Sequence, residues 1–272
     1  MSFPRRSFLV LSIVVLSLIA PAAITAQLSE LDQIQIAPPM SQVQPPSKDA
    51  TAAELEKRGD ELRAEKAYLD SMDYFRAALA KAPNNAQVLN KVGIVELLLQ
   101  RYREAAKDFE QALKKDHKFA EADNNLGVVH YERRKYGAAI KQYRKAIELS
   151  PDGASFYSNL GAAYFARKDF EHASEAYTQA LRLDPLIFDH TSHTGIAAQM
   201  ASPADRAHYD YVLAKLYAKM GDSDHSLQYL RKALEDGYKA VNDALTDPEF
   251  ADLRKDTRFA DLMKARPMAI PE

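Results

Sequence analysis

The chain has 272 residues, with 36 Lys and Arg against 38 Asp and Glu, and it contains neither Cys nor Trp. The absence of Cys excludes disulfide scaffolds, thiolate metal sites and cysteine nucleophiles. The near balance of charge leaves no strong positive field for binding nucleic acid, so we expect no nucleic-acid partner.

The first 26 residues have the pattern of an export signal. Arg5 and Arg6 precede an apolar run over residues 8–24, and Ala26 places a small residue at a cleavage site. We therefore predict a signal peptide over 1–26 and an exported bacterial protein, periplasmic or extracellular. Two alternatives stay open: a twin-arginine export route, and an uncleaved signal anchor that holds the protein in the inner membrane, facing the periplasm.

Residues 27–50 are rich in Gln, Pro and Ser, and they include two Pro-Pro pairs. Such a composition has little apolar surface to bury and favours extended backbone. We predict a disordered tether over 27–50.

From residue 52 the chain repeats with a period of 34 residues. Within each unit, position 8 is Gly, position 20 is small and position 24 is aromatic. These residues are Gly59, Gly93, Gly127 and Gly161; Ser71, Ala105, Ala139 and Ala173; and Phe75, Phe109, Tyr143 and Tyr177. Apolar residues at positions 7, 8 and 11, and again at 20, 24, 27 and 28, give each of two helices an apolar stripe. Each unit is thus predicted to be a helical hairpin that buries its stripe by stacking on its neighbours.

This pattern resembles the tetratricopeptide repeat family, whose repeat has Leu-Gly at positions 7 and 8, Tyr at 11, Ala at 20 and 27, an aromatic residue at 24 and Pro at 32. The best match is Leu160, Gly161, Tyr164, Ala173, Tyr177, Ala180 and Pro185. The family's Trp at position 4 is missing. The resemblance implies an all-α fold, a right-handed α-solenoid of helical hairpins. Within residues 51–187 it places four repeats, at 52–85, 86–119, 120–153 and 154–187.

The chain after the fourth repeat is less regular. The predicted segments are an insertion over 188–206, a fifth repeat-like unit over 207–240, and C-terminal capping helices with a tail over 241–272. Gly195 follows Gly161 by 34 residues and offers an alternative register for the fifth unit. We prefer the register counted from Ala207, because Ser202 and Asp205 flank Pro203 as the cap of a helix that begins there.

The resemblance implies that a partner binds in a concave groove, into which positions 2, 5, 9 and 12 of the first helices point. The candidate groove residues are Asn90, Ile94, Leu97, Asn124, Val128, Tyr131, Ser158, Phe165, Tyr211 and Lys215. The apolar members suit an apolar or amphipathic segment, and the asparagines can hold its backbone. Relatives that grip a C-terminal carboxylate use cations at such positions, whereas Glu56, Asp60 and Glu121 are acidic here.

The predicted function is a non-enzymatic protein–protein interaction scaffold or adaptor in envelope assembly or secretion, with no catalytic residue, cofactor or metal. Two alternatives remain. A metal-assisted hydrolytic site could form from Asp189, His190 and His193 in the insertion, or the repeats could self-associate as a homo-oligomer. His172 and His225 share position 19, which we expect to be exposed.

Overall fold

The structure is a computed structural model, and it describes residues 43–189 and 202–265. The predicted signal peptide, most of the tether, His190 and His193 lie outside the described residues. The chain divides into two units, Met1–Gln44 and Pro45–Glu272, and the helices that the structure describes belong to the second. Over the described ranges the regular structure is helical, without strands, and none of the helices combines the length and apolar character needed to cross a membrane.

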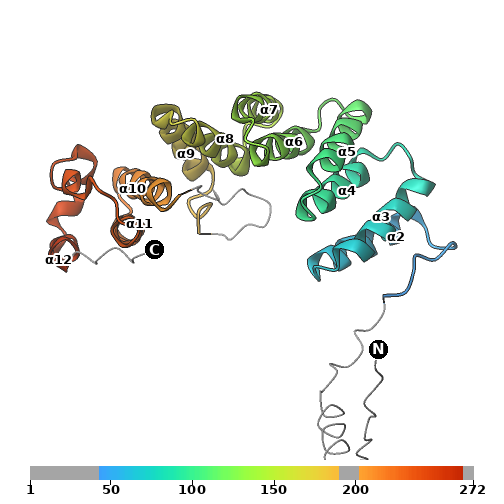
Figure 1. The fold of residues 1–272 in the computed structure, drawn as a ribbon, viewed down its shortest axis with the longest axis horizontal. Helices are drawn as coiled ribbons and strands as arrows, with labels where there is room; N and C mark the ends of the chain where they lie inside the picture. The colour runs from blue at the N-terminus through green and yellow to red at the C-terminus, as the bar shows by residue number, and fades with distance from the viewer. Residues whose placement is uncertain (1–42, 190–201, 266–272) are drawn as a thin grey trace, which may run out of the picture. The chain divides into compact units, whose positions relative to one another are not determined.

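The helices follow one another as hairpins joined by short turns (Figure 1). They are α2 (Ala52–Ala64), α3 (Tyr68–Lys81), α4 (Ala86–Leu98), α5 (Tyr102–Lys115), α6 (Ala120–Glu132), α7 (Tyr136–Leu149), α8 (Ala154–Ala166), α9 (Phe170–Leu183), α10 (Pro203–Lys219), α11 (Ser223–Glu235) and α12 (Thr257–Ala265), with short 3-10 turns η1 (Val241–Leu245), η2 (Pro248–Phe250) and η3 (Leu253–Lys255) before α12. The strongest contacts join the two helices of a hairpin, and α3, α5 and α7 each pack on the next hairpin. The predicted all-α solenoid is confirmed.

Each of the first four hairpins is closed by an aromatic ring lying on a glycine. A Cβ atom added to Gly93 would lie 2.6 Å from Cε1 of Phe109, and the same clash would occur at Gly59, Gly127 and Gly161. The four rings at position 24 are almost completely buried. Glycine at position 8 is therefore required by the ring on the second helix, because any side chain would push the two helices apart.

The fifth hairpin packs its two helices together with different residues at positions 8 and 24. Counted from Ala207, position 8 is Ala214 and position 24 is Leu230, so a methyl group and a smaller apolar side chain replace the glycine and the ring. The Ser226 hydroxyl donates to the Ala214 carbonyl at 2.8 Å. In the first hairpin the Ser71 hydroxyl donates to the Gly59 carbonyl at the same distance and the same 12-residue separation.

The turn within each hairpin places position 15 in the left-handed region. In the four regular hairpins this residue has a side chain, and in the fifth it is Gly221. The side-chain residues are Lys66, Gln100, Arg134 and Lys168, with φ between 56° and 63°. Around Arg134, its own N–H donates to the Tyr131 carbonyl and the Lys135 N–H donates to the His130 carbonyl, which is the hydrogen bonding of a Schellman cap.

The predicted start of α10 is confirmed. Ser202 is the N-cap, its side chain accepts from the Asp205 N–H, and Pro203 opens the helix. At the other end, within the segment 241–272 that is predicted to cap the solenoid, five large apolar residues that the structure describes are buried. They are Phe250, Leu253, Phe259, Leu262 and Met263.

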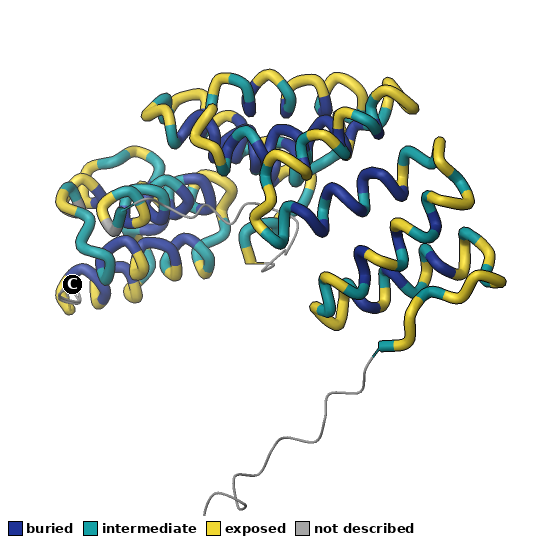
Figure 2. The backbone as a smooth tube through the Cα atoms, turned by 45° about the vertical axis from the view of Figure 1, so that its right-hand side comes forward, coloured by how far each residue is buried: buried dark blue, intermediate teal, exposed yellow. Residues whose placement is uncertain are grey.

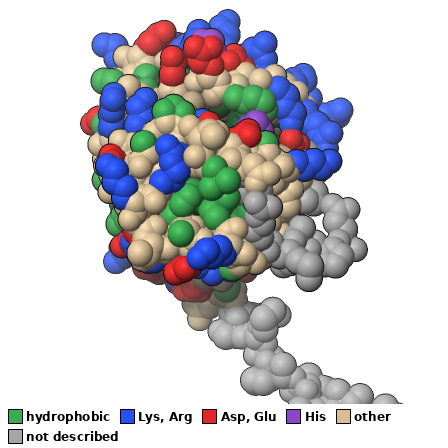
Figure 3. All heavy atoms as spheres, turned by 90° about the vertical axis from the view of Figure 1, so that its left-hand side faces the viewer, with side chains coloured by type: hydrophobic (Ala, Val, Ile, Leu, Met, Phe, Trp, Pro, Cys, Tyr) green, Lys and Arg blue, Asp and Glu red, His purple; other side chains and the backbone are tan. Residues whose placement is uncertain are grey.

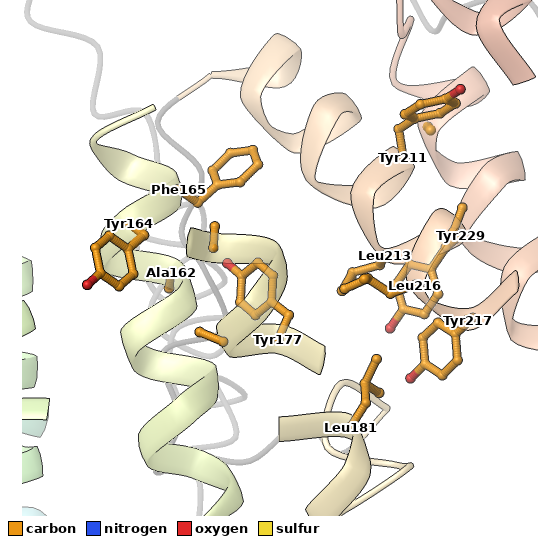
Figure 4. Packing of buried hydrophobic residues seen from close by; sticks show 14 of the residues in the cluster. Ala162, Tyr164, Phe165, Tyr177, Leu181, Tyr211, Leu213, Leu216, Tyr217 and Tyr229 are labelled. Carbon is orange, nitrogen blue, oxygen red and sulfur yellow. The ribbon is translucent and has the colours of Figure 1, made fainter. Parts of the chain in front are cut away.

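The stack is loosest between α9 and α10, the junction that contains the insertion. These two helices make far fewer contacts than α7 and α8, although one cluster of buried side chains continues through the junction from Val128 to Met263. Figure 4 shows Leu181 of α9 pointing towards Leu213 and Leu216 of α10, while the Tyr177 ring lies towards Ala162 of α8 and Tyr211 points away from this group. In Figure 2 the buried positions lie mainly where neighbouring helices meet.

We expect Gly93→Ala to destabilise the fold by about 1–3 kcal/mol, because the new methyl group meets the buried ring of Phe109. Gly137 is a matched control, since a Cβ there would meet nothing within 4 Å, and Gly137→Ala should stabilise slightly. The double variant Gly93→Ala/Phe109→Leu copies the fifth hairpin and should cost less than the sum of its single changes. Urea unfolding of Gly93→Ala, Phe109→Leu, the double variant and Gly137→Ala measures these free energies. A double variant whose loss of stability equals the sum of the two single losses would contradict the prediction.

Arg134→Gly should raise the free energy of unfolding by about 0.5–1 kcal/mol, because glycine adopts a positive φ without steric cost. Arg133 next to it has a φ of −84°, so Arg133→Gly should destabilise. Thermal melts of both variants provide the comparison, and equal effects would show that the left-handed turn carries no strain.

Candidate functional site

A line of polar side chains connects the first helices of the hairpins at a constant spacing of 35 residues. We call it the polar seam. A donor at position 6 of one repeat reaches an acceptor at position 5 of the repeat before it. The three contacts are Lys91 Nζ to Glu56 Oε1 at 2.6 Å, Asn125 Nδ2 to Asn90 Oδ1 at 3.0 Å, and Asn159 Nδ2 to Asn124 Oδ1 at 2.9 Å.

The amide part of the seam is continuous across three helices. Asn124 Nδ2 also donates to Asn125 Oδ1 at 3.3 Å, so that four amides from α4, α6 and α8 form one chain. Asn90, Asn124 and Asn159 are buried, whereas Asn125 is partly exposed. Asn125 is thus the member of the amide chain that solvent or a ligand reaches.

The charged part of the seam is internally neutralised. Lys91 Nζ lies 2.5 Å from Asp60 Oδ2 as well as contacting Glu56. Burial disfavours the charged lysine, but the hydrogen bonds to both carboxylates outweigh it and raise the pKa of Lys91 above its usual value. A cation already held by two carboxylates is poorly suited to gripping a ligand carboxylate.

The structure buries most of the apolar residues that the sequence assigned to the groove. Val128, Tyr131, Phe165 and Tyr211 are each at most 8% exposed. Phe165 is covered by neighbouring rings, with its ring centroid 5.1 Å from that of Phe170. These side chains fill the space between successive hairpins. The candidate groove residues that stay partly exposed are Ile94, Leu97, Ser158 and Lys215.

The polar seam stops before the fifth hairpin. Position 6 there is Val212, which has no polar group, and position 5 is Tyr211. The Tyr211 hydroxyl instead donates to Asp247 Oδ2 at 2.6 Å, in the turn between η1 and η2. Lys215 Nζ lies 3.2 Å from Asp247 Oδ2 and 3.3 Å from Glu249 Oε2. The two last groove candidates are therefore tied to the C-terminal cap.

A cavity of about 560 Å³ lies between α9, α10 and the C-terminal 3-10 turns. We call it the α9–α10 cavity. One side is a series of rings: Phe170 and His208 have centroids 4.2 Å apart, His208 and Tyr238 stack at 5.7 Å, and Tyr238 and Tyr211 stack at 4.2 Å. Burial and the charge of Lys168 lower the pKa of His208, which keeps this ring neutral near pH 7.

Carboxylates outnumber cations in the α9–α10 cavity. Its acidic lining residues are Glu171, Glu175, Asp243, Asp247 and Glu249, and its lysines are Lys215 and Lys219. Sequence reasoning missed this cavity because the acids come from two segments far apart in the chain. On the face of the molecule drawn in Figure 3, charges of both signs surround a hydrophobic patch.

His225 does not have the exposed surroundings expected for position 19. Its Nδ1 lies 2.6 Å from Asp222 Oδ2, and its Nε2 lies 2.8 Å from Asp189 Oδ2 at the start of the predicted insertion. The hydrogen bond to Asp222, together with the charge of Asp189, holds the pKa of His225 above its usual value. His172 on α9 has the equivalent partner, Asp169, and forms no second ion pair within the described part of the chain.

The same segment is held by two tyrosines of the fifth hairpin. The Tyr217 hydroxyl donates to the Pro185 carbonyl at 3.3 Å, and the Tyr229 hydroxyl donates to the Phe188 carbonyl at 3.2 Å. Asp189 is thus engaged in docking residues 184–189 against α10 and α11. Across the residues that the structure describes, no cluster of three His, Asp or Glu side chains suits a metal ion.

The fold defines the class of protein as an α-solenoid of 34-residue helical hairpins. Models of the family described as TPR repeat or tetratricopeptide repeat match residues 130–167, 154–185 and 209–235. The chain therefore contains tetratricopeptide repeats, as its resemblance to that family implied. A search of the curated proteins gives no match.

Solved structures of the same architecture resemble this chain at low sequence identity. The chain is 19% identical to PilF of Pseudomonas aeruginosa, with a TM-score of 0.51 over 79% of this chain and 92% of PilF. It is 20% identical to MamA of Desulfovibrio magneticus RS-1, with a TM-score of 0.49 over 68% and 93% of the two chains. At these identities the similarity concerns the fold alone.

The contact of His225 with Asp189 should make the docking of residues 184–189 depend on pH. Because the pKa of His225 is raised in the folded state, its stabilising contribution is complete below the unfolded value of about 6.5 and is lost as pH rises through the folded value. His225→Gln should lower the Tm by about 2–4 °C at pH 5.5 and by less at pH 9.

His172→Gln is the matched control, because the ion pair of His172 is with Asp169 at the start of its own helix and does not join two segments of the chain. Hydrogen exchange of residues 184–189 should speed up in His225→Gln at pH 5.5 and stay unchanged in His172→Gln. Equal exchange in both variants would show that Asp189 does not hold the segment through His225.

Proposed function

We propose that this protein is a non-enzymatic scaffold that binds an extended segment of another protein along the first helices of its hairpins. The observation that carries the proposal is the polar seam, whose contacts recur every 34 residues and which presents Asn125 at the surface. An asparagine side chain offers both a donor and an acceptor, which is the pairing that an extended peptide backbone requires.

The chemistry around the seam favours an amphipathic segment. Ile94 and Leu97 of α4 stay partly exposed beside the amide chain, and they can contact apolar side chains of the partner. The neutralised Lys91 argues against a partner that is recognised through its C-terminal carboxylate. Tetratricopeptide repeats serve as protein-interaction modules, which supports the same class of function.

The setting that we propose is the bacterial envelope, where the chain is exported by its signal sequence and takes part in assembly or secretion. This rests on Arg5, Arg6 and the apolar run over residues 8–24. A signal that stays uncleaved would anchor the protein in the inner membrane, with its repeats on the periplasmic side.

Photo-crosslinking tests the proposal. A photoreactive residue at Leu97, in cells with an intact envelope, should give one dominant adduct with another protein. A photoreactive residue at Lys141, which is exposed on a second helix, should not give that adduct. Self-adducts alone would contradict peptide binding and support the homo-oligomer. Equal adducts from Leu97 and Lys141 would also overturn the proposal.

Asn125→Ala should weaken binding of the captured partner segment by about 3–10-fold, because it removes the exposed amide of the seam. Asn84→Ala is the matched control, since Asn84 is an exposed asparagine in the turn before α4. Fluorescence anisotropy with a labelled peptide from the adduct measures both affinities. An unchanged affinity for Asn125→Ala would exclude the seam from the binding site.

A further inference from the structure

The α9–α10 cavity holds a surplus of negative charge against an aromatic wall. Five carboxylates face two lysines, and the nearby His208 is kept neutral by its surroundings. Among the residues that the structure describes, Glu171, Glu175 and Asp243 form no ion pair. A half-enclosed space of this charge favours an organic cation, since low solvent exposure strengthens the attraction.

The rings add a second, independent preference for a cation. Phe170, His208, Tyr238 and Tyr211 form a row of neighbouring rings in the cavity lining, in which His208, Tyr238 and Tyr211 are stacked and Phe170 is tilted against His208. The face of an aromatic ring attracts a guanidinium or ammonium group through its quadrupole, and apolar carbon atoms of the same ligand pack against it. Carboxylates and aromatic rings that line the same cavity are therefore suited to a cation on an apolar stem.

The cavity already contains such a group from the chain itself. The Lys215 ammonium lies between Asp247 and Glu249, and Asp247 is oriented by the Tyr211 hydroxyl. Lys215 leaves the three acids on α9 and η1 unpaired. Its own position shows how an alkylammonium group is held here, and it also competes with any incoming cation for two of the five carboxylates.

We propose that the α9–α10 cavity binds a guanidinium or primary ammonium group, carried by an arginine or lysine side chain of the partner or by a free polyamine. When the cation is a side chain of a partner peptide, this proposal rests on the proposed function and deepens it, because Tyr211 and Lys215 occupy groove positions of the fifth hairpin. A segment that lies along the polar seam and ends in a basic anchor would occupy both sites.

An NMR titration of the purified protein with small probes tests the cavity without the partner. N-acetyl-arginine methylamide should shift amide signals of α10 and η1, whereas the neutral isostere N-acetyl-citrulline methylamide should not. Spermidine in a parallel titration distinguishes a free polyamine from a peptide side chain as the better ligand. No shifts with either cation, or equal shifts with arginine and citrulline, would overturn the proposal.

Three variants locate the binding. Glu171→Gln/Asp243→Asn should weaken the arginine probe by about fivefold, because it removes two unpaired charges while keeping side-chain shape. Glu110→Gln/Glu148→Gln, with both acids exposed on α5 and α7, is the matched control and should bind as the wild type does. Lys215→Met should tighten binding by about fivefold, because it frees Asp247 and Glu249.

The outcomes separate this inference from the proposed function. Probe binding in the cavity without any adduct from Leu97 would support the cation site and contradict the peptide groove. An adduct from Leu97 without probe binding would support the peptide groove and contradict the cation site. Probe binding that is insensitive to both Glu171→Gln/Asp243→Asn and Lys215→Met would place the cation elsewhere and overturn the assignment.

Discussion

The close approach of two helices at position 8 is the constraint on which the solenoid depends. In four hairpins a ring from the second helix lies directly on a glycine of the first, as Phe109 lies on Gly93, and both are buried. The ring fills the space that the missing side chain leaves, so the pair is close-packed without strain. The fifth hairpin keeps the same total volume with Ala214 and Leu230. What the repeat conserves is therefore the sum of two side chains and not the identity of either.

Uniform hairpins have a consequence at the surface. Because each repeat has the same geometry, a side chain at position 6 meets position 5 of the previous repeat at every regular junction, and three different pairs use that contact. One pair is ionic and two are amides, so the geometry is constant while the chemistry varies. The insertion ends this regularity. Beyond it, Val212 offers no donor, Tyr211 turns to Asp247, and the looser junction between α9 and α10 contains the cavity.

The parts of the fold that repeat were predictable from sequence, and the parts that arise from a single junction were not. Period and apolar spacing predicted the hairpins, and Ser202 predicted the start of α10 because capping is a local property. The position rule placed Phe165 on the groove side, but it does not say how closely the next hairpin approaches, and Phe170 covers that ring. The contact of His225 with Asp189 joins segments 36 residues apart across the insertion, which no repeat pattern encodes.

At the regular junctions of the solenoid, the polar side chains at positions 5 and 6 pair with each other. We therefore expect recognition at positions where this pairing leaves a polar group exposed or is missing. Asn125 is such a position within the regular part, because its amide stays partly exposed while its neighbours in the seam are buried. The junction of α9 and α10 is the larger departure, because carboxylates without an ion pair and a row of rings line one cavity there. Both proposed binding positions are thus departures from the matched pairing, whereas the matched hairpins provide the stability.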